Sequence, residues 1–116
     1  MTQAFVFEKL DVYRAAREAL ALAAGCKGAL KGLPGEVAPQ LERALVSVVA
    51  NICEACGRQS LADRQRHYAI ARGSATEAGG LVEIAHVLGA LTDEQRDALR
   101  SRLLRVAWML TAMLRR

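Results

Sequence analysis

The sequence is poor in the features that build β-sheet, disulfide-bonded and membrane proteins. It holds 2 prolines in 116 residues and few β-branched residues, which disfavours an all-β fold. Its 3 cysteines, Cys26, Cys53 and Cys56, are too few and odd in number for a disulfide framework. The longest apolar runs, near 44–52 and 106–114, fall far short of the ~20 residues of a membrane span. We therefore expect no membrane partner.

Signals for secretion and for nucleotide binding are also missing. The N-terminus has no basic stretch followed by an apolar run, so we expect no secretory signal and a cytoplasmic location. Neither GxxxxGK[ST] nor GxGxxG occurs, which excludes the usual phosphate-binding loops of nucleotide enzymes.

Strong helix formers dominate what is present. Alanine, leucine and arginine are the commonest residues, and apolar residues make up 53% of the chain. The length fits a single domain, residues 1–116. Helix-start signals at Ser60 and Thr92, and a stop at Gly89, divide the chain together with a glycine-rich segment at 25–35. The expected helices are 7–24, 36–56, 61–88 and 93–114.

Each expected helix carries an apolar stripe with spacings of three and four residues. The last helix has Leu99, Leu103, Val106 and Leu110, and the second has Leu41, Ala44, Leu45, Val48 and Ile52. The third has Ile70, Leu81, Ile84 and Leu88, flanked by Ala71, Ala78, Val82 and Ala85. Short links force neighbouring helices to run in opposite directions. The sequence thus predicts an all-α fold, an antiparallel up-down-up-down four-helix bundle.

Apolar residues also occur where an isolated bundle should be polar. Val46, Ala50 and Cys53 lie opposite or beside the main stripe of the second helix, and Trp108 points away from Leu99. Tryptophan is enriched at interfaces. We predict that Val46, Ala50, Cys53 and Trp108 form an oligomer interface. The alternative is scattered apolar surface residues, which monomers tolerate.

A second set of polar residues is expected between the second and third helices. Ser74 and Glu77 fall inside the apolar arc of the third helix, where a carboxylate must be paired or protonated. The polar strip of the second helix supplies partners. The predicted structural network comprises Ser47, Asn51, Glu54, Ser74 and Glu77. The alternative, Glu77 as an active-site acid, lacks a nucleophile–base pair, so we expect no catalytic residue and no enzyme.

Cys53 and Cys56 form a CxxC pattern near the end of a helix. Redox CxxC pairs sit at a helix N-terminus, where the dipole lowers the thiol pKa. A zinc site needs two further ligands, and Cys26, His67 and His86 are scattered. We interpret these cysteines as structural, and expect neither a metal nor a cofactor.

The positive charge is confined to the second half of the chain. Residues 1–57 carry six basic and six acidic side chains, whereas residues 58–116 carry ten and six. Clustered arginines with nearby aromatic residues suit phosphate neutralisation and base stacking. The predicted nucleic-acid-binding residues are Arg58, Arg64, Arg66, Arg72, Arg102 and Arg105. The alternative is an ordinary solvated face.

Several blocks of the sequence resemble a known family over 7–114. They include residues 7–13, Leu33-Pro34, residues 40–44, Ser47, Asn51-Ile52, Glu54, Gly57-Arg58, residues 70–74, Glu77 and Leu88-Gly89. The sequence is similar to bacterial four-helix bundle proteins first noticed as products of intervening sequences in 23S ribosomal RNA genes. It departs from their pattern at Cys53, where Ala is usual, and at Ala55, where Gly is usual; together these create the CxxC.

The resemblance implies a ring-shaped homopentamer without enzymatic activity. It also implies a relation to accessory variability determinants of diversity-generating retroelements, basic pentamers thought to bind nucleic acid and a reverse transcriptase. We therefore expect a homopentameric scaffold whose partners are RNA, DNA, or a reverse transcriptase or other nucleic-acid enzyme. The alternative is a protein-only interaction module whose charge serves solubility.

Overall fold

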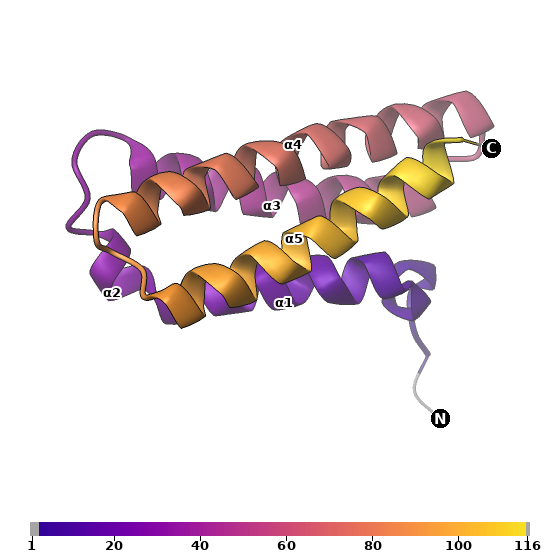
Figure 1. Ribbon diagram of the computed structural model, residues 1–116. Coiled ribbons are helices and arrows are strands. Elements are labelled where there is room, and N and C mark those ends of the chain that lie inside the picture. Colours follow the sequence, from indigo (N-terminus) through magenta and orange to yellow (C-terminus); the bar gives the residue numbers. More distant parts are fainter. Residues whose placement is uncertain (1–2, 116) are drawn as a thin grey trace.

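The computed structural model describes residues 3–115, and every regular element in that range is helical (Figure 1). This confirms the all-α class. The elements are a 3-10 turn η1 and five α-helices: η1 Val6–Lys9, α1 Asp11–Gly25, α2 Lys27–Leu30, α3 Val37–Cys56, α4 Leu61–Val87 and α5 Asp93–Leu114.

The predicted helix boundaries at 60, 89 and 92 are confirmed by local hydrogen bonds and backbone angles. Ser60 Oγ accepts from the backbone N–H of Asp63 at 3.1 Å, which caps α4. At α5 the Thr92 hydroxyl accepts from the Gln95 N–H at 3.1 Å, and the Gln95 side chain accepts from the Thr92 N–H at 2.9 Å. Gly89 has φ +83°, the left-handed conformation that ends a helix.

The beginning of the chain differs from the prediction of one helix over 7–24. Leu10 is extended, so α1 begins at Asp11 and the residues before it form the separate turn η1. The ring of Phe7 packs on those of Phe5 and Tyr13, with centroids 5.2 Å and 4.9 Å apart. The glycine-rich segment also holds the short helix α2, which the sequence did not predict.

The four long helices pack as the corners of a square. α3 packs on α4, α4 on α5, α5 on α1, and α1 on α3, so α3 and α5 occupy opposite corners. In Figure 1, α5 lies in front and α3 behind. The predicted stripes of α3 and α5 form the middle of the core: Leu41, Leu45, Val48, Ile52, Leu99, Val106 and Leu110 are nearly inaccessible.

The predicted stripe of α4 is wrong in part. Ile70, Ile84 and Leu88 are 41–51% exposed, and only Leu81 of that set is buried. The buried face of α4 consists mainly of small residues: Ala71, Ala75, Ala78, Val82 and Ala85. Alanines let α4 approach α3 and α5 closely, and this turns the larger isoleucines outward.

No helix within residues 3–115 combines the length and apolar character needed to cross a bilayer.

Candidate functional site

Arginines from the α3–α4 link, the first half of α4 and the residue after α5 lie toward one end of the molecule. α3 ends there, and α4 begins after a four-residue link. The end of α5 lies close to the start of α4, as the hydrogen bond from the Gln65 side chain to the Met113 carbonyl at 3.3 Å shows. The end carries the predicted set Arg58, Arg64, Arg66 and Arg72, and adds Arg115 at the close of α5. We call these five residues the basic end. Arg116 lies outside the described residues.

Two acids lie among these arginines. The Arg58 guanidinium is 3.2 Å from the Glu54 carboxylate and 3.7 Å from that of Asp63. Arg66 is 3.5 Å from the same Asp63. All four side chains are roughly 40–60% exposed, and such surface pairs contribute little free energy. The guanidinium groups of Arg58 and Arg66 therefore stay partly accessible to solvent beside these acids.

Two of the other three arginines of the basic end, Arg64 and Arg72, are held by neutral acceptors. Arg64 donates to the backbone carbonyls of Arg58 and Gln59 at 3.0 and 3.1 Å. Arg72 donates to the Thr111 hydroxyl of α5 at 2.7 Å. These bonds orient the guanidinium groups without neutralising their charge.

Arg102 and Arg105, the remaining predicted nucleic-acid ligands, lie on α5 apart from the basic end. Arg102 turns toward α1, where its guanidinium is 3.4 Å from the Glu18 carboxylate. Arg105 is exposed and lines a shallow depression of about 380 Å³ together with Trp108 and Leu104. The six predicted arginines thus fall into two separate groups.

A chain of hydrogen bonds runs along the contact between α3 and α4. The hydroxyls of Ser47 and Ser74 are 2.8 Å apart, and the Asn51 amide donates to the Ser47 carbonyl and hydroxyl at 2.9 and 3.2 Å. The Asn51 oxygen lies 2.9 Å from Nδ1 of His67. We call Ser47, Asn51, His67 and Ser74 the polar seam. Three of these residues were predicted to join a network; His67 was not.

The seam assigns the proton on His67, which is 8% exposed. The Arg66 guanidinium lies 3.2 Å from Nε2 and has only hydrogens to offer, so Nε2 is the acceptor. The Asn51 amide nitrogen is engaged with Ser47, so its oxygen faces His67 and Nδ1–H donates to it. Both ring nitrogens of His67 thus have a hydrogen-bond partner within the bundle.

The two predicted carboxylates of the network lie outside the seam. Glu54 is half-exposed and pairs with Arg58. Glu77 is exposed, and it lines a polar recess of about 280 Å³ with Arg43, Gln40 and the seam serines. The expectation of a buried Glu77 was wrong because it placed the apolar face of α4 on Ile70 rather than on the alanines.

The Cys53 thiol of the CxxC pattern is poorly suited to nucleophilic chemistry. Burial, and then the neighbouring Cys56, raise the pKa of Cys53. The Tyr68 hydroxyl is 3.9 Å from Cys56 Sγ, and burial raises the pKa of Tyr68 to about 12. Among residues 3–115 no three His, Cys, Asp or Glu side chains converge as a metal site.

The predicted interface residues occupy two opposite corners of the bundle. Val46 is 47% exposed on α3, where Ala50 is also exposed and Cys53 is half-buried. Trp108 is 70% exposed on α5, the opposite corner. The fold therefore presents two different apolar faces pointing in opposite directions.

These features define a small all-helical protein with a basic end, a polar seam and two outward apolar faces. The profile of the 23S rRNA-intervening sequence protein family matches residues 8–112, and the chain belongs to this family. No protein of curated function matches the sequence.

A solved structure shares the fold. It is the crystal structure of a protein with unknown function from the S23 ribosomal protein family of Bacteroides thetaiotaomicron. The sequences are 23% identical, the match covers 90% of this chain and 99% of the other, and the TM-score is 0.82.

Proposed function

We propose that this protein is a non-enzymatic, homopentameric scaffold, built from antiparallel up-down-up-down bundles, that binds RNA or DNA through its basic end. The observation that carries the proposal is that Arg58 in the α3–α4 link, Arg64, Arg66 and Arg72 in the first half of α4, and Arg115 just after α5 lie toward one end of the bundle. A clustered positive field attracts polyanions. We place the protein in the cytoplasm, where such partners occur.

Ring assembly is supported by the two apolar faces. A two-fold dimer uses the same face on both subunits, whereas a closed ring joins two different faces head to tail. Val46 and Ala50 on α3 point away from Trp108 on α5, which favours head-to-tail contact over a two-fold dimer; closure into a ring further requires a constant rotation between successive subunits. A ring also repeats the basic end once per subunit, so weak phosphate contacts add through avidity.

The oligomer is tested by light scattering after size exclusion. We expect a particle about five times the mass of the 12.5 kDa chain. Trp108→Glu should weaken assembly and so reduce the particle mass, because assembly would bury an unpaired charge. Arg17→Glu changes an exposed residue on α1 and should leave the particle mass unchanged. A 12.5 kDa particle at micromolar concentration would refute assembly.

Nucleic-acid binding is tested by fluorescence anisotropy with labelled RNA and DNA across a salt series. Replacing Arg64 and Arg115 by Gln should reduce the slope of log affinity against log salt concentration by about 1.5 in magnitude. Each phosphate contact contributes about 0.7–0.9 to that slope. The matched control replaces Lys27 and Lys31, which lie at the other end (Figure 1) and carry the same charge. A separate variant, Arg102→Gln with Arg105→Gln, tests the group on α5.

A second candidate is a protein-only interaction module. It is favoured by the acids already paired with Arg58, Arg66 and Arg102. Its partner is then a protein of unidentified kind, whereas a reverse transcriptase or another nucleic-acid enzyme belongs with the first candidate. Absence of RNA and DNA binding at about 50 mM salt and 10 μM protein, with assembly intact, would favour this candidate over the first.

A further inference from the structure

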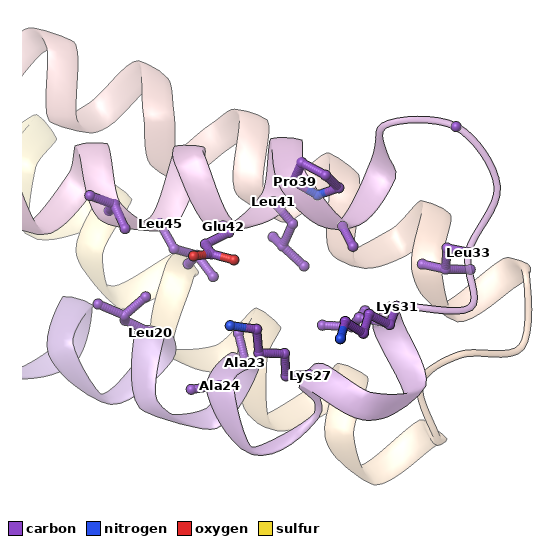
Figure 2. A pocket seen from close by; sticks show the side chains of 14 residues that line it. Leu20, Ala23, Ala24, Lys27, Lys31, Leu33, Pro39, Leu41, Glu42 and Leu45 are labelled. Atoms are coloured by element: carbon purple, nitrogen blue, oxygen red, sulfur yellow. The ribbon is translucent and has the colours of Figure 1, made fainter.

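An apolar cavity of about 430 Å³ lies between the end of α1, the short helix α2 and the start of α3. Figure 2 shows Leu20, Ala23 and Ala24 on one side facing Leu41, Glu42 and Leu45 on the other. Most of its lining is aliphatic, and Lys27, Lys31 and Glu42 contribute its charged groups. Half of its lining residues are exposed, among them Val46 of the predicted oligomer interface, so the space is open to the surface; its volume is one that ligand pockets commonly have.

Local sequence explains why the space stays open. Ala23, Ala24 and Ala38 are too small to bridge from α1 to α3. The segment after Lys31 loops outward and turns at Gly35, whose φ is +63°, before α3 begins at Val37. The loop therefore leaves the space between α1 and α3 unfilled.

The mouth of the cavity carries more positive than negative charge. Lys27 and Lys31 stand four residues apart, one turn of helix, and both are exposed. Neither forms an ion pair with any group in residues 3–115, and like charges at this spacing repel. Glu42 is the one acid that lines the cavity. An anion held by both lysines would relieve their repulsion.

We propose that this cavity binds an anionic amphiphile, the carboxylate of a medium-length acyl chain. The chain lies along Leu20, Leu41 and Leu45, and the carboxylate lies between the ammonium groups of Lys27 and Lys31. An aliphatic lining suits a saturated chain, and the excess of cations selects a carboxylate over a cationic or neutral head group.

Calorimetry with decanoate, octanoate, decanol and decyltrimethylammonium tests the ligand class. Each methylene moved from water into the cavity strengthens binding about fourfold, so decanoate, with two more methylenes, should bind about fifteenfold more tightly than octanoate. Lys27→Gln with Lys31→Gln should weaken decanoate about fivefold and leave decanol unchanged. The control, Lys9→Gln with Arg17→Gln, removes the same charge elsewhere and should change the affinity for neither decanoate nor decanol.

A second pair of variants tests the location. Ala24→Phe fills the cavity from α1, whereas Ala21→Phe places the same ring one turn away at an exposed position outside it. Ala24→Phe should abolish decanoate binding and Ala21→Phe should preserve it, with circular dichroism unchanged in both. Binding that is equal for all head groups, or equal in both variants, would overturn the proposal. An absence of decanoate binding would also overturn the proposal. If decanoate does not bind and Ala24→Phe disrupts the oligomer, a second copy of the chain occupies the cavity instead.

Discussion

Replacing Asn51 by alanine should destabilise the protein by about 2 kcal/mol, because this one side chain connects both halves of the polar seam. The change removes its bonds to Ser47 and to His67, at 2.9–3.2 Å. Each hydrogen bond contributes about 0.5–1.5 kcal/mol net, and the buried Nδ1–H of His67 is left without a partner, at about 1–3 kcal/mol. The higher helix propensity of alanine offsets about 0.6 kcal/mol of this loss in the free energy of unfolding.

The measurement is urea unfolding followed by circular dichroism at equal protein concentration, since oligomer stability depends on concentration. Glu54→Ala is the matched control on the same helix: its half-exposed pair with Arg58 should cost less than about 1 kcal/mol. In a His67→Leu background the cost of Asn51→Ala should fall by about 1 kcal/mol, because the two residues share a bond. A loss for Asn51→Ala no larger than that for Glu54→Ala, or no coupling to His67, would refute the seam.

Three further outcomes are expected. Gly80→Ala should raise the free energy of unfolding by roughly 1 kcal/mol, measured in urea, since Gly80 is exposed in the middle of α4 and an added Cβ meets nothing within 4 Å. Cys53 should react with a thiol reagent at pH 8 more slowly than a free cysteine peptide, because burial raises its pKa; an equal rate would contradict that environment. The hydrogen bond from His86, at 2.7 Å, lowers the pKa of Asp93, so its stabilisation is complete above the ordinary Asp pKa and is lost as pH falls through the lower folded value. The stability difference between the native protein and His86→Gln should therefore shrink on acidification from pH 5 to pH 2; a difference independent of pH would contradict it.

Sequence patterns predicted α3 and α5 well because their stripes contain large residues. Leu99, Leu103, Val106 and Leu110 are all buried, and no competing stripe exists on α5. On α4 two stripes compete, and the larger residues of one, Ile70 and Ile84, suggested the wrong face. Periodicity reports which residues are apolar but not how closely two helices approach, and close approach is what favours the alanines.

The candidate site was predicted unevenly for related reasons. Ser47, Asn51 and Ser74 were recognised as polar residues facing a neighbouring helix, and they do share hydrogen bonds. His67 stands among arginines in the sequence, so nothing local marked it as buried, although it shares a face with Ala71 and Ala78. The cavity beside α2 depends on the path of the loop before α3, which has no periodic pattern to read.

The outer face shared by α3 and α4 places stricter demands on a partner than the face around Trp108. Arg43 and Glu77 line one recess on this face, yet neither forms an ion pair within residues 3–115. A subunit that covered the apolar Val46 and Ile70 would also cover these charges. Leaving them unpaired would oppose the apolar contact, so a partner that offers an acid to Arg43 and a base to Glu77 fits this face best. This requirement favours one partner in one register, as a closed ring of identical subunits needs.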